Sequence, residues 1–124
     1  LSLAAILAAC AGTQAAPPLA RGTSSAAPVC VGSLDCMTKM NAARNWIAAN
    51  SGLGLIVDSE DTLETGGWGM PNYTSVRVER RPIGEGRFWI IAAIQCGNGG
   101  GQPGLCPDTA AALANFNTTV SAAF

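Results

Sequence analysis

The 124-residue chain contains no histidine, and only 12% of its residues are charged. Histidine is the commonest general base and metal ligand, so its absence excludes Ser-His and Cys-His catalytic pairs. Lys and Arg number 7 against 8 Asp and Glu, which gives a formal net charge of −1. Nucleic-acid binding needs clustered basic residues to displace counterions, and we therefore expect no nucleic-acid partner.

The chain also lacks a long apolar run. Residues 1–9 are uncharged and typical of the apolar core of a secretory signal peptide, and the sequence is expected to begin inside that leader. A bilayer core of about 30 Å needs roughly 20 apolar residues for a crossing. We therefore predict no transmembrane helix.

The end of this segment carries a more specific motif, Leu7-Ala8-Ala9-Cys10-Ala11. It resembles the lipobox of bacterial lipoproteins, in which Leu and two small residues precede the cysteine that is acylated. The resemblance is confined to the leader. It implies that a diacylglyceryl group is attached to the Cys10 sulfur, that the leader is cut before Cys10, and that the new amine receives a fatty acid such as palmitate.

The resemblance also implies a location in the cell envelope. Two or three acyl chains anchor a protein to a bilayer far more firmly than one. Ala11 departs from the Asp that commonly retains such proteins at the inner membrane, so in a Gram-negative host the resemblance implies an outer-membrane anchor facing the periplasm. The alternative is an ordinary leader, cut after Ala11 or Ala15, which releases a secreted or soluble periplasmic protein.

Either leader exports the chain to an oxidising compartment, where an even number of remaining cysteines favours two disulfides among Cys30, Cys36, Cys96 and Cys106. The sequence leaves three connectivities open. Local pairs, Cys30 with Cys36 and Cys96 with Cys106, are favoured because a short glycine-containing segment separates each pair. A zinc site is disfavoured because Cys-x-x-Cys and histidine are both missing. We expect no metal and no cofactor.

Composition divides the chain into three parts: the leader, a tether at residues 10–29, and a single domain at residues 30–124. The tether is rich in Ala, Pro, Ser and Thr and would reach on the order of 25 Å as a flexible coil. Within the domain, apolar residues spaced by three and four predict helices over about 34–50 and 107–122. Met37, Met40 and Trp46 of the first helix are expected to pack in the core, and Gly52 is expected to follow the end of that helix.

Extended patterns predict the strands between these helices. One bent strand or two short ones fit residues 53–65, and further strands are predicted over 74–81 and 87–96, joined by a turn at 82–86. The 87–96 segment is apolar at both alternating sets of positions, so it is expected to be buried on both faces or central in the sheet. The predicted fold is α+β, with a small antiparallel sheet of three or four strands packed with an N-terminal and a C-terminal helix.

Two groups of residues are candidate partner contacts. Trp68 and Tyr73 lie in a predicted loop containing Gly and Pro, where aromatic side chains either cover a core edge or anchor an interface. The predicted hairpin carries four arginines that can form a basic patch for lipid phosphate, cell-wall carboxylates or an acidic partner: Arg77, Arg80, Arg81 and Arg87. Glu79 and Glu85 lie among them and can neutralise the patch.

Two further segments have weaker functional signals. The acidic run at residues 58–61 lacks EF-hand spacing, and we interpret it as a solvated turn that interrupts a strand. The glycine-rich run at 97–101 lacks the Lys of a phosphate-binding loop, and we interpret it as a loop closed by a disulfide.

No catalytic constellation is present in the sequence, which has no histidine and no Gly-x-Ser-x-Gly elbow, so we expect no enzymatic activity. Paired carboxylates such as Glu60 and Glu64 are the remaining alternative, as groups that act on a glycosidic bond. The sequence predicts a membrane-anchored envelope lipoprotein with a non-enzymatic interaction or structural domain, whose candidate partners are an envelope protein or the cell wall. A secreted or tethered inhibitor of an external enzyme is the alternative function.

Overall fold

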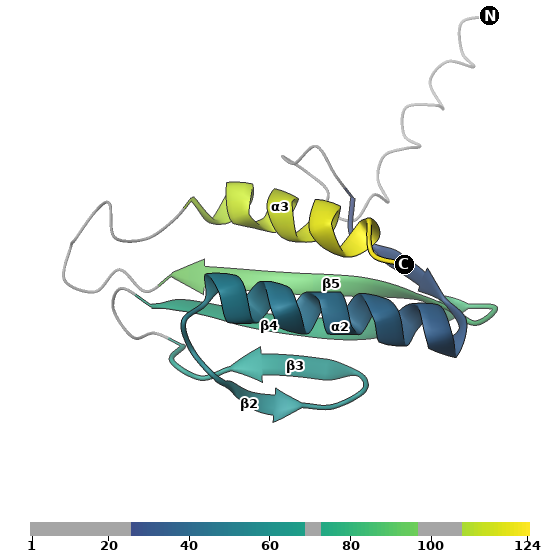
Figure 1. The fold of residues 1–124 in the computed structure, drawn as a ribbon, viewed down its shortest axis with the longest axis horizontal. Coiled ribbons are helices and arrows are strands. Elements are labelled where there is room, and N and C mark those ends of the chain that lie inside the picture. The colour runs from purple at the N-terminus through teal and green to yellow at the C-terminus, as the bar shows by residue number, and fades with distance from the viewer. Residues whose placement is uncertain (1–25, 69–72, 97–107) are drawn as a thin grey trace, which may run out of the picture.

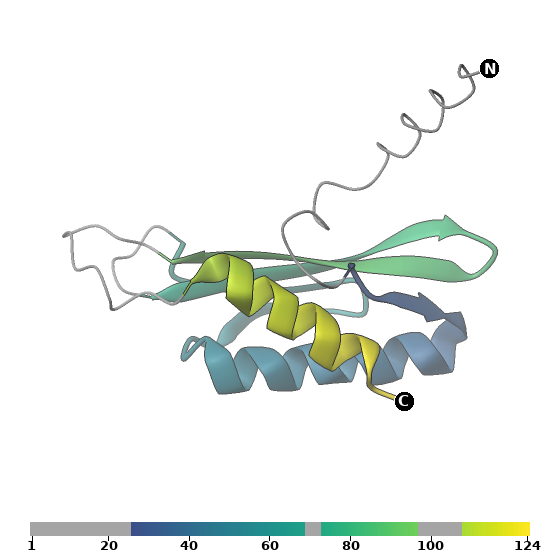
Figure 2. The same cartoon turned by 90° about the horizontal axis from the view of Figure 1, so that it is seen from above.

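A computed structural model describes residues 26–68, 73–96 and 108–124 of the chain (Figure 1). In chain order the elements are β1 (Val29–Val31), α2 (Gly32–Asn50), β2 (Leu55–Asp58), β3 (Thr62–Thr65), β4 (Thr74–Gly84), β5 (Arg87–Cys96) and α3 (Thr109–Ser121). The strands form one antiparallel sheet in the order β1-β5-β4-β3-β2. Both helices lie against the same face of this sheet (Figures 1 and 2). The predicted α+β class is confirmed.

The described sheet has five strands, rather than the three or four that the sequence predicted. One reason is Ser59, whose hydroxyl accepts the backbone N–H groups of Asp61 and Thr62 at 3.3 and 3.0 Å. Such a side-chain-supported turn reverses the chain, so the 53–65 segment forms the hairpin β2–β3. The other reason is β1, which pairs with β5 and includes Val29, the last residue of the predicted tether.

The two predicted helices are present, and local polar contacts fix where they begin. Asp35 accepts the backbone N–H of Val31 at 2.8 Å, a donor at the start of α2 that has no partner within the helix. Asp35 also pairs with Lys39 at 2.7 Å. Asp108 accepts the backbone N–H groups of Ala110 and Ala111 in the same way at the start of α3. Gly52, with a φ of +78°, follows the end of α2 as the sequence predicts.

The core lies between the helices and the sheet. Trp46 of α2 meets Phe116 of α3 edge to face, with ring centroids 5.3 Å apart, and its indole N–H donates to Asn115 at 2.7 Å. The core side chains are Cys30, Cys36, Met40, Ala43, Trp46, Ile47, Leu63, Val76, Val78, Ile90, Ala92, Phe116 and Val120. The predicted core roles of Met40 and Trp46 are therefore confirmed.

Strands β4 and β5 form a long hairpin with a two-residue turn. Glu85 and Gly86 both have positive φ, 59° and 75°, as a type I′ turn requires. Because Gly84 pairs with Arg87, β4 continues into the segment predicted as a five-residue turn.

Strand β5 is paired on both edges, by β1 and by β4, as its composition predicts. Burial on both of its faces is not observed. The helices cover only one side, and on the other β5 presents partly or fully exposed residues: Arg87, Trp89, Ile91, Ala93 and Gln95. We call the side of the sheet that points away from the helices the outer face.

One disulfide, Cys30–Cys36, is present among the described residues and confirms that predicted pairing. It joins β1 to α2, with Cα atoms 4.9 Å apart, and both cysteines are fully buried. Cys10 and Cys106 lie outside the described residues. The lipidation of Cys10 and the second bridge, Cys96–Cys106, therefore stay predictions.

Removing this bridge is expected to destabilise the domain. We define the soluble chain as residues 10–124 with Cys10→Ser; it retains every described residue. Replacing Cys30 and Cys36 together by Ala should lower its free energy of unfolding by roughly 2 kcal/mol, because the unfolded chain regains the entropy of a short closed loop. Urea unfolding measures the difference, and an unchanged free energy would show that the bridge has no stabilising role.

Candidate functional site

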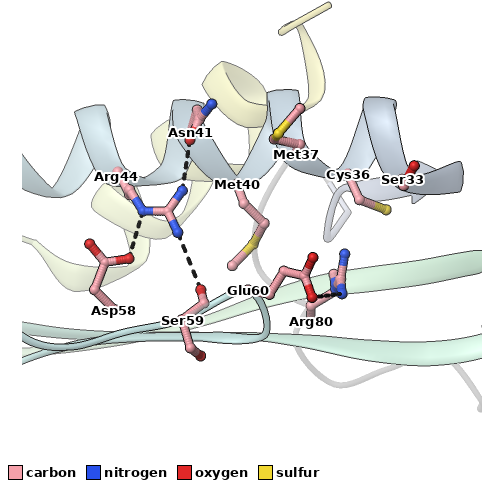
Figure 3. Close-up of a pocket in the computed structure, with 10 residues that line it drawn as sticks. All are labelled: Ser33, Cys36, Met37, Met40, Asn41, Arg44, Asp58, Ser59, Glu60 and Arg80. Atoms are coloured by element: carbon pink, nitrogen blue, oxygen red, sulfur yellow. Dashed lines mark hydrogen bonds and ion pairs between the residues drawn. The ribbon is translucent and has the colours of Figure 1, made fainter.

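A groove of about 460 Å³ lies between α2 and the turn that joins β2 to β3 (Figure 3). Side chains of α2 form one wall, the turn forms the other, and β4 contributes Arg80. The lining residues are Ser33, Cys36, Met37, Met40, Asn41, Arg44, Asp58, Ser59, Glu60 and Arg80. The groove therefore combines apolar sulfur-containing side chains with a polar rim.

Arg44 holds α2 to the acidic turn. Its Nε donates to Asp58 Oδ1 at 2.8 Å and its Nη2 donates to the Ser59 carbonyl at 3.2 Å. Nη1 donates to Asn41 Oδ1 on the preceding turn of the helix at 2.7 Å, which orients the guanidinium (Figure 3). The three contacts set the width of the groove at this end.

Arg80 holds the same turn to β4. Its Nε and Nη2 donate to Asp61 Oδ1 at 3.0 and 2.8 Å, and its backbone N–H donates to the Asp61 carbonyl at 2.8 Å. The guanidinium also lies 4.5 Å from the centroid of the Phe88 ring, a cation–π contact. With only 13% of its side chain exposed, Arg80 is a packed part of the groove wall.

The acidic run at 58–61 is an exposed turn in which two carboxylates, those of Asp58 and Asp61, bind arginines. Within the described ranges, no three acidic or sulfur groups come together as a metal site would require. The groove lining offers hydrogen-bond groups and apolar contact but no activated nucleophile beside a base.

Sequence reasoning missed this groove. It assigned Met37 to the core, and that assignment is wrong: Met37 is 55% exposed, whereas Met40 is 2% exposed. Met37 and Arg44 are seven residues apart and so lie on the same side of α2, a spacing that could have indicated a shared surface. The partner wall, Asp58 to Glu60, comes from a distant part of the chain and carried no such signal.

The outer face of the sheet carries the second group of candidate residues. Cross-strand pairs align Val29 with Trp89 and Trp89 with Arg81. Other rows of the ladder add further residues to the same face: Thr62, Glu64, Arg77, Glu79, Ile91 and Ala93. Between Arg87 and Gln95 at its two ends, the β1 and β5 half of this face is apolar, and charged residues predominate in the β4 and β3 half.

The charged half is an alternating network centred on Glu79. Arg77 Nη2 lies 2.6 Å from Glu79 Oε2, Arg81 Nη2 lies 3.0 Å from Glu79 Oε1, and Arg77 also pairs with Glu64. Hydrogen bonds from Arg77, and then from Arg81, hold the pKa of the Glu79 carboxyl below its usual value. Glu79 therefore neutralises part of the predicted basic patch.

The four predicted arginines do not form one patch. Arg77, Arg81 and Arg87 belong to the outer face, whereas Arg80 lies on the opposite side in the groove. Alternation of side chains along β4 is the physical reason, since neighbouring residues 80 and 81 point to opposite faces. Within the part of the chain that the structure describes, Arg87 makes no ion pair.

Trp68 and Tyr73 lie apart from both sites. They are 37% and 44% exposed and flank residues 69–72, which lie outside the described residues, as does the glycine-rich run at 97–101. Because Thr74 pairs with Cys96, Tyr73 adjoins the end of the sheet opposite the β4–β5 turn. These aromatics and the arginines near that turn therefore cannot contact one small ligand together.

Acid is expected to destabilise the soluble chain in part through Glu79. Its folded-state pKa lies below the ordinary 4.5, so the charged carboxylate stabilises the fold above that value, and this stabilisation is lost as the pH falls through the folded-state pKa. The free energy of unfolding should fall between about pH 5 and about pH 3, and Glu79→Gln should reduce that fall. The hydrogen bond from Lys39 lowers the pKa of Asp35 in the same way. The Glu79→Gln variant therefore retains the part of the acid effect that is due to Asp35.

Glu60→Gln is the matched control for this pH dependence. The Glu60 side chain is 87% exposed and its nearest arginine nitrogen is 3.9 Å away. Urea unfolding at both pH values should show a smaller acid effect for Glu79→Gln and an undiminished effect for Glu60→Gln. Equal acid effects in the two variants would contradict the role assigned to Glu79.

Comparisons with protein-family models, curated proteins and solved structures find no match to this chain. Among the described helices, none has both the length and the apolar character needed to span a bilayer.

Proposed function

We propose that the protein is a membrane-anchored envelope lipoprotein, held at the outer membrane through Cys10, whose folded domain is a non-enzymatic binding module. The observation that carries the proposal is the motif Leu7-Ala8-Ala9-Cys10 at the end of an uncharged segment. Attachment of two or three acyl chains at Cys10 would bind the chain stably to a bilayer without a membrane-spanning helix.

The covalent structure of the domain supports export. Cys30 and Cys36 are joined and fully buried, and bridges of this kind persist in oxidising compartments outside the cytosol. A domain of this size buries a modest share of its surface, so a buried bridge contributes usefully to its stability.

The geometry of the surface supports binding rather than catalysis. Arg44 and Arg80, the cations of the groove, are already engaged by Asp58 and Asp61. Groups fixed in this way can position a ligand, but they are poor proton acceptors at neutral pH because guanidinium stays protonated. The outer face adds a second surface with adjacent apolar and charged areas.

Affinity capture tests the binding role. The soluble chain, immobilised through an N-terminal tag, is incubated with detergent extracts of the native envelope, and the eluates are compared with those of an Arg44→Gln, Asp58→Asn double variant. We expect an envelope protein or cell-wall fragment to be retained by the first bait and lost by the second. In a parallel incubation with hydrolases from outside the cell, retention of a hydrolase with its activity inhibited would instead support an enzyme inhibitor and contradict the proposal.

A further inference from the structure

The apolar half of the outer face is concentrated around Trp89. Val29 lies opposite it on β1 and Arg81 lies opposite it on β4, while Ile91 follows two residues later on the same side of β5. Val29 and Val31 are 38% and 55% exposed. This area is therefore an aliphatic and aromatic surface that neither helix covers (Figure 2).

Positive charge borders this apolar area. Arg81 has 60% of its side chain exposed, and Arg87 is an exposed neighbour of Trp89 on the same strand face. The carboxylates of the outer face, Glu64 and Glu79, both bind Arg77, and Glu79 also binds Arg81. Glu85 of the β4–β5 turn brings the local charges to balance, so the basic groups open to a ligand are the exposed part of Arg81 and Arg87, which makes no ion pair among the described residues.

We propose that this area docks onto the anionic phospholipid headgroups of the leaflet that holds the lipid anchor, an inference that depends on the proposed function. Trp rings favour the boundary between hydrocarbon and headgroups, where an apolar body and a polar N–H are both satisfied. Arginine side chains can lay their aliphatic stems on apolar surface while the guanidinium meets phosphate. Trp89 supplies the aromatic ring, and its neighbours Arg81 and Arg87 supply the guanidinium groups.

The path of the chain allows this face to reach the bilayer. Val29 belongs to the face and begins β1, so the chain from Cys10 enters the domain at the edge of the proposed docking area. The 18 residues between Cys10 and Val29 limit their separation to at most roughly 65 Å. A surface held within that distance experiences headgroups at an effective concentration in about the millimolar range, so even a weak contact is populated.

Vesicles test the docking without native acylation. The soluble chain, with a hexahistidine tag at its N-terminus, is attached to vesicles of phosphatidylcholine, phosphatidylglycerol and nickel-chelating lipid. Because the chain contains no histidine, the tag is its single attachment point. We expect phospholipids brominated on their acyl chains to quench tryptophan emission. Trp89→Tyr should abolish this quenching, whereas Trp68→Tyr should retain it.

A charge-matched pair tests the role of the arginines. Arg81→Gln with Arg87→Gln should weaken the binding of the untagged soluble chain to phosphatidylglycerol vesicles roughly tenfold or more, since each basic residue near an anionic surface contributes about fivefold. Asn45→Glu with Ala49→Glu lowers the net charge equally on exposed positions of α2, on the opposite side of the sheet. That control should bind nearly as well as the parent chain.

Three results would overturn the inference. One is the absence of quenching from the vesicle-attached chain, and another is an equal loss of binding in the two charge variants. The last is a dimer of the soluble chain, seen by sedimentation and abolished by Trp89→Tyr, which would assign the face to a second copy. Because the tag replaces the acyl chains, these results are independent of whether Cys10 is acylated in cells, so failure here is distinguishable from failure of the proposed function.

Discussion

Phe116→Ala is expected to lower the free energy of unfolding of the soluble chain by about 3–5 kcal/mol. Phe116 is fully buried, and its ring packs edge to face against Trp46 between the two helices. Truncation removes apolar area from the core and leaves a cavity that the surrounding elements fill only in part. For a small domain whose total stability is about 5–15 kcal/mol, such a loss leaves little stability in reserve.

Phe124→Ala is the matched control, because the terminal phenylalanine is fully exposed. Its effect should lie within about 0.5 kcal/mol of zero. Urea unfolding, followed by tryptophan fluorescence and by far-ultraviolet circular dichroism, measures both variants. Similar losses for the two phenylalanines would contradict the packing of α3 onto α2 and the sheet.

Cys10→Ser, made in the native cell, is expected to remove the protein from the outer-membrane fraction almost completely. A serine hydroxyl cannot accept the thioether-linked diacylglyceryl group, so the proposed anchor is lost at its point of attachment. Cell fractionation followed by immunoblotting provides the measurement.

The control for this variant is Ala15→Leu. It blocks the rival cleavage site after Thr13-Gln14-Ala15, which needs a small residue, and leaves the lipobox resemblance intact. We expect its distribution to match that of the parent. Retention of the Cys10→Ser protein in the outer membrane, or release caused by Ala15→Leu, would contradict anchoring through Cys10.

The sequence predicted the parts of the fold that have long, regular patterns. The helix over 34–50 is close to the observed Gly32–Asn50, and the 87–96 strand has the observed bounds. The Cys30–Cys36 pairing also followed from spacing. By contrast, Val29–Val31 is too short for any periodicity to show, and its pairing with β5 depends on a contact between distant parts of the chain.

The candidate site was less predictable because it is built from distant segments. Arg44 and Asp58 are 14 residues apart and belong to different elements, so only the packing of α2 beside the β2–β3 hairpin brings them together. The separation of Arg80 from Arg81 follows from strand alternation, once the strand is known to be covered on one side only. Trp89 was expected in a fully buried strand because sequence does not show which sheet face the helices leave open.

Intact-mass spectrometry of the protein purified from native membranes tests the central claim most directly. The account predicts a chain that begins at Cys10 and carries the mass of a diacylglyceryl group and an amide-linked fatty acid. A chain that begins at Gly12 or Ala16 with no added lipid mass would contradict it.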